Sequence, residues 1–480
     1  MSDNQKSGVV GGNYRWVGNN TRRPDGVDKV TGRARYGDDM VLPGMLHMRM
    51  LRSPHAHAKI LSIDTSEAEA VKGVKAVVTH KDVPDHPPAK PPFGPAVSDF
   101  HDLSRNIMAR EKVLYDGHAV AAVAATTESI AKHAVRKIKV EYEVLPHVLD
   151  PYEAAQAGAP ILHEHQFTLG IEPKPKEPSN LFRTLGGEQG DLGQGFEKSD
   201  LVIEREFSSQ PVHQGYIEPL ACVASSSEDG AVELWTSTQG HFVARTLLSR
   251  LLNLDMSKFR VTASEIGGGF GGKTTIYHEP AAILLSMKTG RPVRSVMTRG
   301  EVLRATGPTV GSVCRIKIGA MKDGTLVAAD AEIWYQAGAF KGGPVARATD
   351  SFFSPYKIPN ARTACHDVCV NRPKAAAYRA PGAPMATWAA EAVINELANE
   401  LGLDPIEMRL KNAVKEGDTS LMGTKHGRIG CIEVLEAAKN HPHYKASLKQ
   451  NQGRGVALGY WLHGGGLSSA SANLLDDGTL

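Results

Sequence analysis

The feature that most constrains the fold is a glycine-rich segment, GGGFGGKT at 267–274, between a predicted strand at 259–264 and a helix that begins at Tyr277. Glycines leave the backbone N–H groups open to a close neighbour. The segment must therefore form a tight strand-to-helix loop that either packs a helix onto a sheet or holds a ligand.

Two nucleotide-binding motifs fit this segment. As GxxxxGKT it is a P-loop with Lys273 as phosphate ligand, and as GxGxxG from Gly267 it is a dinucleotide fingerprint. Glu265 would place a negative charge beside the phosphates, and the acid expected about 20 residues after the fingerprint is missing, since the first candidate is Glu301. A glycine bend without a ligand is a third interpretation.

The composition is typical of a globular protein with several domains. The 480 residues correspond to about three domains of about 150 residues each. The net charge of +3 gives no excess that would bind nucleic acid, and 41% hydrophobic residues exclude a disordered chain. No apolar run approaches the roughly 18 residues that span a membrane, and no secretory signal opens the chain, so we expect a cytoplasmic protein.

We predict an α+β fold with two unequal domains. The expected divisions are an N-terminal arm at 1–24, a mixed α/β domain at 25–150, a linker at 151–200 and a larger mixed α+β domain at 201–480. The first domain contains a buried strand at 119–125, a helix at 127–138 and an alternating strand at 139–145. The glycines at 186–195 predict no regular element in the linker.

Periodicity places the other elements. Strands are predicted at 45–51, 59–64, 74–79, 201–208, 231–237, 292–298, 313–320, 325–335 and 362–370. Helices are predicted at 66–71, 240–252, 277–288, 385–401 and 405–414. The dipeptide Asp323-Gly324 is typical of a hairpin turn between the strands that flank it.

The last residues suggest that the sequence continues on another chain or segment. Strands are predicted at 455–462 and 470–475, followed by a turn at Asp477-Gly478 without a returning strand. We therefore expect a fragment, or one half of a divided protein that another chain completes.

Cysteine and histidine spacing predicts no metal site. The five cysteines are scattered without a CxxC pair, so an iron–sulfur cluster or structural zinc held by this chain alone is not expected, and Cys365 and Cys369 should be buried thiols in a reducing compartment. His55 and His57 are expected to pack in the first domain. His163 and His165 have no third ligand close by in the sequence.

Two more loops stand out. The segment TSTQGH at 236–241 places the uncharged amide of Gln239 where a strand ends and a helix begins, and AAAYRAPGAP at 375–384 surrounds Tyr378 and Arg379 with small residues. Taken alone, the first reads as a helix cap and the second as a rigid turn.

Together, GGGFGGK, TSTQ and AAAYRAPGAP resemble the molybdopterin-binding large subunits of the xanthine dehydrogenase family of molybdenum hydroxylases. The segments KVTGRARYGDD at 29–39, LPG at 42–44 and RSPHAH at 52–57 are similar to the hammerhead-like entrance domain of these subunits. HQGYIEP at 213–219 is similar to the start of their cofactor domain. The resemblance runs from about residue 25 to Leu480.

The resemblance implies a fold, a reaction and a site. The fold is an entrance domain followed by the first part of a molybdopterin-binding domain, and the reaction is a two-electron hydroxylation of an electron-poor carbon with water as the oxygen source. The carbon would belong to an N-heterocycle, an aldehyde or an aromatic thioester. The implied cofactor-binding residues are Gln239, which would hydrogen-bond an oxo ligand of the metal, Gly269, Phe270 and Arg379. The implied substrate pocket is formed by Phe270, Ala377, Tyr378 and Arg379.

The resemblance also implies partners. The cofactor, a molybdenum-molybdopterin in its plain or cytosine dinucleotide form, would hold the metal through its own dithiolene, with no protein side chain as ligand. An iron–sulfur small subunit and a FAD-binding medium subunit would take the electrons, and the complex would form a dimer without nucleic acid or a membrane span. The glutamate general base is expected beyond Leu480, on a C-terminal remainder or complementing chain, so no catalytic residue is identified here.

Some residues depart from family patterns. Thr274 stands where purine-oxidising relatives have an acid, and Ala377 and Ala380 stand where carbon monoxide dehydrogenases have a cysteine close by, so neither substrate is expected. Two alternatives stay open: a P-loop nucleotide-binding enzyme, and a non-catalytic half that needs a second chain.

Overall fold

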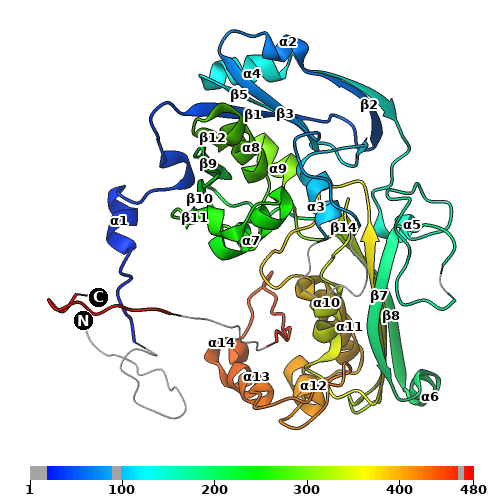
Figure 1. Ribbon diagram of the computed structural model, residues 1–480. Helices are drawn as coiled ribbons and strands as arrows, with labels where there is room; N and C mark the ends of the chain where they lie inside the picture. The colour runs from blue at the N-terminus through cyan, green and yellow to red at the C-terminus, as the bar shows by residue number, and fades with distance from the viewer. Residues whose placement is uncertain (1–18, 89–98, 174, 463–469, 480) are drawn as a thin grey trace.

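The computed structural model describes residues 19–88, 99–173, 175–462 and 470–479, drawn in colour in Figure 1. Three sheets form its framework, with seven, five and three strands. The mixed α+β architecture predicted from the sequence is confirmed. No helix in the described ranges is long and apolar enough to cross a bilayer.

The seven-stranded sheet joins residues from both predicted domains. Its order is β11-β10-β9-β12-β1-β5-β3. The strands are β1 (Leu46–Arg52), β3 (Val74–Thr79), β5 (Ala119–Ala125), β9 (Ala221–Ser226), β10 (Val232–Thr236), β11 (Phe259–Ala263) and β12 (Val293–Val296). The junction is the parallel pairing of β1 with β12, in which Leu46 lies opposite Val293.

Helices cover both faces of this sheet. On one face lie α7 (His241–Leu252) and α8 (Glu279–Thr289), which share a core with Ala122 and Ala124 of β5. On the other lie α2 (Ser66–Glu69) and α4 (Glu128–Val135), which share a core with Ala121 and Val123. Because both faces are covered, all seven residues of β5 are buried, as the continuous apolar run predicted.

Shorter elements complete this half of the molecule. The three-stranded sheet has β2 (Ala58–Asp64) between β4 (Lys112–Val113) and β6 (Lys139–Val144). The remaining helices here are α1 (Gly26–Thr31), η1 (Gly37–Asp39), α3 (Phe100–Ile107), η2 (Met256–Lys258) and α9 (Arg299–Ala305).

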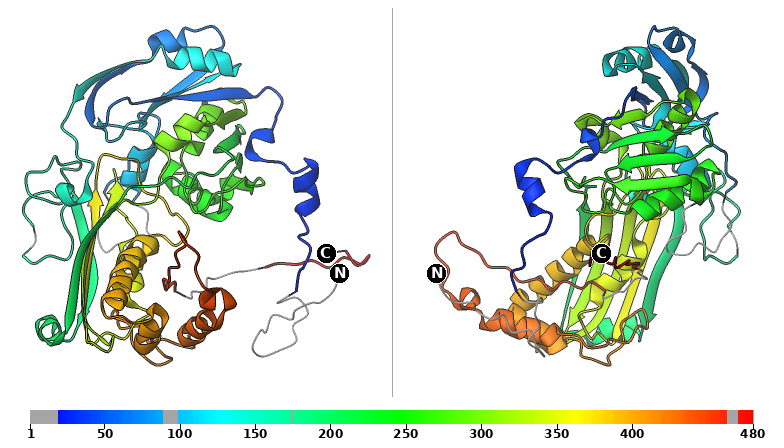
Figure 2. Two further views of the ribbon diagram at one scale, coloured as in Figure 1. Left: turned by 180° about the vertical axis from the view of Figure 1, so that it is seen from behind. Right: turned by 60° about the vertical axis from the view of Figure 1, so that its left-hand side comes forward.

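The five-stranded sheet is the framework of the second half, and Figure 2 shows it as one long layer with the orange helices along one side. Its order is β7-β15-β14-β13-β8. The strands are β7 (Leu181–Gln189), β8 (Leu201–Ser209), β13 (Ser312–Ala320), β14 (Leu326–Gly338) and β15 (Asn360–Cys369). Strands β13 and β14 form the predicted antiparallel hairpin.

Helices α10 (Val345–Phe353) and α11 (Ala383–Glu400) bury their apolar residues in one core with β13, β14 and β15. The other helices of this half are α5 (Pro151–Ala154), α6 (Leu192–Lys198), α12 (Pro405–Asn412), α13 (Cys431–Asn440) and α14 (Pro442–Lys445). The five cysteines are all free and buried, which confirms the buried thiols predicted for Cys365 and Cys369.

Two sequence predictions are wrong. The segment 186–195 is not irregular: its first residues belong to β7 and its last to α6. Glycine is needed there because a Cβ on Gly186 would lie 1.8 Å from the Thr363 backbone oxygen of β15. The strands predicted at 455–462 and 470–475 do not form among the described residues, which have no strand partner there. The division into domains at 150 and 200 stays a prediction.

Candidate cofactor-binding site

The glycine loop between β11 and α8 is shaped by close backbone contacts. Positive φ angles occur at Gly268 (96°), Phe270 (52°) and Gly271 (106°). A Cβ on Gly269 would lie 2.5 Å from Gln239 Oε1, and one on Gly271 would lie 2.5 Å from the Ala377 backbone oxygen. The glycines therefore let two other loops approach the backbone at distances that no side chain would allow.

Gln239, which follows β10, is the first of these neighbours. Its Oε1 accepts hydrogen bonds from the backbone N–H groups of Gly271 (2.8 Å) and Lys273 (3.2 Å). These bonds assign the oxygen end of the amide and fix the side chain on the loop. The residue is exposed, and its Nε2 has no hydrogen-bond partner within the described part of the chain, so that donor is left for a bound group.

The segment 377–380 is the second neighbour. The Arg379 backbone N–H donates to the Phe270 oxygen (2.9 Å), and Ala380 has a φ of 64°. Gln214 supports the segment from below, since its Nε2 donates to the backbone oxygens of Ala377 (2.8 Å) and Gly307 (3.1 Å). None of the residues that the structure describes donates a hydrogen bond to the buried Oε1 of Gln214, so a bound group or a water can donate one there.

A buried ion pair anchors the loop from beneath. Lys273 is 1% exposed, and its Nζ lies 2.7 Å from Glu218 Oε2, which also accepts from the Gly267 N–H (2.8 Å). Glu218 Oε1 accepts from the Gly37 N–H (3.2 Å), and the ammonium lies 4.8 Å from the centre of the Tyr216 ring. Burial lowers the pKa of Lys273, an effect that Glu218 partly offsets.

The P-loop interpretation is therefore wrong. A P-loop lysine must reach a bound phosphate, whereas this ammonium is enclosed and neutralised in the core. The same residue that completed the motif in the sequence serves instead to hold the glycine loop in place.

The structure brings together the predicted site residues. Gln239, Gly269, Phe270, Ala377 and Arg379 are joined by the contacts above, and Tyr378 lies half-buried between two of them. Sequence reasoning assigned no role to Gln214 or Glu218, and it considered Lys273 only as a phosphate ligand. The sequence did contain a signal for Gln214 and Glu218, since both belong to the HQGYIEP segment that resembles the start of the cofactor domain.

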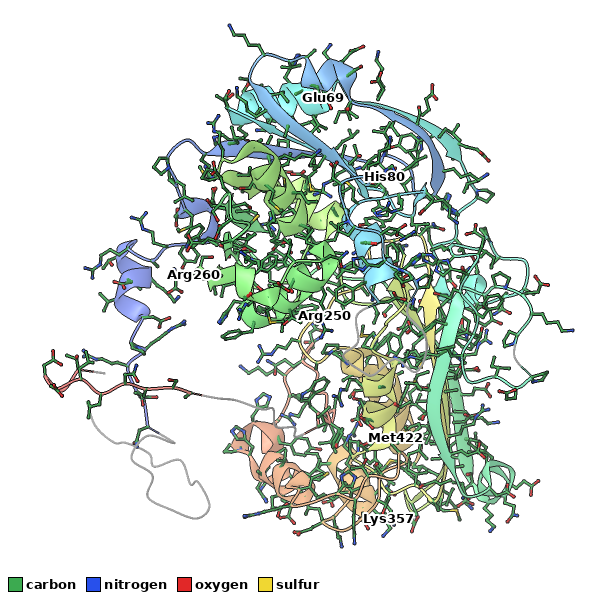
Figure 3. The ribbon with its side chains drawn as sticks, viewed as in Figure 1. Glu69, His80, Arg250, Arg260, Lys357 and Met422 are labelled. Carbon is green, nitrogen blue, oxygen red and sulfur yellow. The ribbon has the colours of Figure 1, made fainter. Side chains whose placement is uncertain are left out.

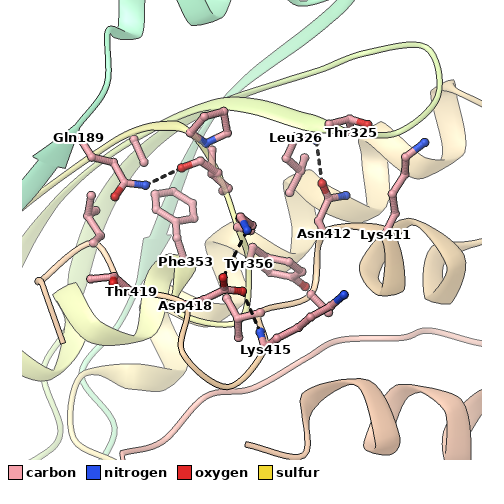
Figure 4. A pocket seen from close by; sticks show the side chains of 17 residues that line it. Gln189, Thr325, Leu326, Phe353, Tyr356, Lys411, Asn412, Lys415, Asp418 and Thr419 are labelled. Atoms are coloured by element: carbon pink, nitrogen blue, oxygen red, sulfur yellow. Dashed lines mark hydrogen bonds and ion pairs between the residues drawn. The ribbon is translucent and has the colours of Figure 1, made fainter. Parts of the chain in front are cut away.

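A second pocket lies elsewhere, between β14, α12 and the residues that follow α12 (Figure 4). Its volume is about 660 Å³. Lys357 lines this pocket. Figure 3 shows Lys357 well away from Arg250 and Arg260, which belong to the half of the molecule with the seven-stranded sheet. Two of its lysines already have carboxylate partners: Lys357 contacts Asp418 (3.2 Å), and Lys411 contacts Asp323 (2.6 Å).

The three loops suit a bulky cofactor held by backbone and amide contacts. The amide donor of Gln239, the backbone of the glycine loop and the buried acceptor oxygen of Gln214 lie close together. The five cysteines are buried thiols. A cofactor that carries its own metal ligands fits this donor set, because it needs hydrogen bonds rather than thiolates or imidazoles. The class defined by the fold and the site is a cofactor-binding subunit.

Comparison with known proteins identifies the family. The molybdopterin cofactor-binding domain model matches residues 174–413, and the a/b hammerhead domain of aldehyde oxidase and xanthine dehydrogenase matches residues 31–146. The chain belongs to the family of molybdopterin-binding large subunits of molybdenum hydroxylases, as the sequence motifs indicated.

Curated relatives differ in length. The chain is 36% identical over 455 residues to a probable xanthine dehydrogenase subunit of Bacillus subtilis, covering 93% of this chain and 58% of that protein. It is 32% identical over 434 residues to the nicotinate dehydrogenase large molybdopterin subunit of Eubacterium barkeri, covering 90% of this chain and 97% of that protein. The chain thus spans little more than half of one relative and nearly all of another.

Solved structures share the fold. Aldehyde oxidoreductase from Desulfovibrio gigas superposes with a TM-score of 0.78 at 30% identity, covering 88% of this chain and 46% of that chain. Quinoline 2-oxidoreductase from Pseudomonas putida 86 superposes with a TM-score of 0.77 at 26% identity, covering 88% and 54%. The predicted hammerhead-like domain followed by a larger molybdenum-binding domain is confirmed.

Proposed function

We propose that this chain forms one wall of the active site of a molybdenum hydroxylase that hydroxylates an electron-poor carbon with oxygen from water. The observation that carries the proposal is the anchoring of Gln239: two loop N–H groups fix its oxygen and leave its Nε2 free. The molybdopterin cofactor supplies the two-electron redox chemistry when it is bound.

The residues of this chain would bind and orient. Gln239 would donate from Nε2 to a polar ligand of the metal, and the backbone at Gly269 would approach the cofactor where no side chain intervenes. Phe270, 49% exposed, would flank the substrate with its ring. The exposed guanidinium of Arg379 would bind an anionic or carbonyl group, in a pocket that Ala377 and Tyr378 shape.

The family resemblance implies the substrate class. An N-heterocycle, an aldehyde or an aromatic thioester would bind in the pocket that Phe270 and Ala377 help to form. Thr274 and Ala380 argue against a purine and against carbon monoxide, as the sequence motifs predict.

A second chain or segment would complete the site. Large apolar side chains stand exposed on the segments that form it: Ile217 (88%), Phe242 (68%) and Phe270 (49%). We propose that a C-terminal complementing part covers them and supplies the general base.

Small iron–sulfur and medium FAD-binding subunits would take the electrons, the complex would dimerise, and the cofactor would be the plain or cytosine dinucleotide form. Five buried free thiols support a reducing cytoplasm as the location.

The test uses the complex with all its co-purifying chains, from a host that loads a control molybdenum hydroxylase. We expect about one molybdenum and one pterin per chain, and oxidation of an aldehyde or N-heterocycle with an artificial electron acceptor. Gln239→Ala should lower turnover at least about tenfold, because an oriented donor is lost, while the exposed control Gln194→Ala should not. Absence of molybdenum and pterin, or equal activity of the two variants, would refute the proposal.

A further inference from the structure

A cluster of histidines with a buried carboxylate lies outside the glycine-loop site. His101 and Asp102 come from α3, and His163 and His165 come from the segment that follows α5. Potential ligand atoms of His101, Asp102 and His165 all lie within 4.8 Å of one another. The sequence shows no third ligand close to His163 and His165, whereas the fold brings His101 and Asp102 of α3 beside His165.

The spacing suits a small cation. His101 Nδ1 and Asp102 Oδ1 are 3.2 Å apart, close to the roughly 3.3 Å between two ligands of a tetrahedral zinc with bonds of about 2.0–2.1 Å. The rings of His101 and His165 meet edge to face with centroids 4.7 Å apart. Because His165 is exposed, a small rotation of its side chain can close the remaining gap.

The charges around the carboxylate also suit a dication. Lys341 Nζ lies 2.6 Å from the other oxygen of Asp102 and 2.7 Å from Asp99 Oδ2. One ammonium thus faces two carboxylates, and this group of three carries a net charge of −1. The Asp102 oxygen that faces His101 is not the one held by Lys341, so it can serve as a metal ligand without breaking that ion pair.

The cluster opens into a pocket of about 270 Å³, which leaves room for water on the cation. The two cationic side chains that line it are neutralised locally: Arg105 contacts Glu111 (3.1 Å), and Lys112 contacts Glu164 (2.8 Å). His163 forms the far wall, with Nε2 engaged by the Ala339 backbone oxygen at 2.6 Å. A partly enclosed site with two imidazoles, a carboxylate and open positions is typical of a bound transition metal.

We propose that His101, Asp102 and His165 form a binding site for a divalent transition metal, with Zn²⁺ as the cation that best fits two nitrogens and one oxygen. The metal would link α3 to the segment at 162–166, next to the residues that follow β14. This position joins the half of the molecule that carries the seven-stranded sheet to the half that carries the five-stranded one, so binding should stabilise their contact.

The test measures zinc binding to the intact chain with its co-purifying subunits, after chelator treatment and independently of its molybdenum content. Competition with a chromophoric chelator gives the affinity, and Co²⁺ in place of Zn²⁺ gives the absorption spectrum of the site. We expect one tight site per chain. His165→Ala should weaken it more than about a hundredfold, since even partners that merely support metal ligands are worth 10–100-fold.

Two further variants make the result specific. His133→Ala removes another exposed histidine, on α4, and this variant should bind zinc like the unchanged protein. His165→Cys keeps a ligand and should restore binding, with a sulfur-to-cobalt charge-transfer band in the Co²⁺ form. Equal zinc affinity in His165→Ala and His133→Ala, or a cysteine variant without that band, would overturn the assignment. The zinc-binding experiment measures neither molybdenum content nor enzyme activity. A protein without the zinc site could therefore still be a hydroxylase, and a protein without hydroxylase activity could still bind zinc.

Discussion

Replacing Lys273 by methionine should destabilise the protein strongly, because it leaves the Glu218 carboxylate without its cation. Lys273 is 1% exposed, and its ammonium lies 2.7 Å from the carboxylate of Glu218, whose side chain is 10% exposed. Removing one partner of such a buried pair costs about 3–5 kcal/mol. We expect a loss of this size in the free energy of unfolding, measured by urea denaturation.

A double-mutant cycle separates the pair from simple packing. Glu218→Gln together with Lys273→Met removes both charges, so the double variant should recover part of the loss. Glu218 also accepts hydrogen bonds from two backbone N–H groups, one at each oxygen, and glutamine has only one acceptor oxygen. The free energy of unfolding of the double variant should therefore stay about 1–2 kcal/mol below that of the unchanged protein. As a matched control, Lys59→Met breaks the exposed pair with Glu143 and should change stability by less than about 1 kcal/mol.

The outcome bears directly on the site. If Lys273→Met were as mild as Lys59→Met, the ammonium would not be buried against Glu218. A lysine free to face a ligand would then return the P-loop interpretation to consideration.

Three other predictions concern pH, a strand and the site. His118 is fully buried, accepts from the Leu114 N–H and contacts the Arg105 oxygen, and burial lowers its pKa from 6.5 to about 4. The unfolded chain therefore binds the extra proton between those values, so stability should fall as the pH drops from about 6.5 to 4, by up to about 1.4 kcal/mol per unit for this histidine. His118→Gln should flatten the urea-unfolding profile across that window, and parallel profiles would contradict the assignment. Gly186→Ala, whose Cβ would meet the Thr363 oxygen at 1.8 Å, should lower the unfolding free energy by about 1–3 kcal/mol or more, whereas Gly427→Ala, with open space around it, should change it by under about 0.5 kcal/mol; similar losses would refute the close approach. Gly269→Ala should displace Gln239 and lower the pterin content of the purified complex, and full pterin retention would show that the loop tolerates a side chain there.

Local patterns predicted much of the fold. The apolar run at 119–125, the capped helix α4 and the hairpin around Asp323-Gly324 were predicted correctly, because each depends on neighbours in sequence. The segment 186–195 was missed because glycines that weaken an isolated strand are what β7 needs against β15. The pairing of β1 with β12 was not foreseen, since nothing local marks two strands so far apart in the chain as partners.

The site was predictable to a similar extent. Gln239, the glycine loop and Arg379 were found as motifs, and the contacts between them follow from the fold. The burial of Lys273 was not predictable, because a motif records residue types and not whether a partner such as Glu218 encloses them. The cluster around His101 was missed for a similar reason, since its members lie on segments about 60 residues apart.

The most direct measurement is an electron-density or cryo-EM map of the complex purified with its partner chains. We predict density for a tricyclic pterin cofactor bounded by the glycine loop, the amide of Gln239 and the 377–380 segment, with Gln239 Nε2 at hydrogen-bond distance from a ligand of the metal. Density for the cofactor elsewhere, or a partner's apolar side chains filling the space between these loops, would contradict the assignment of the site.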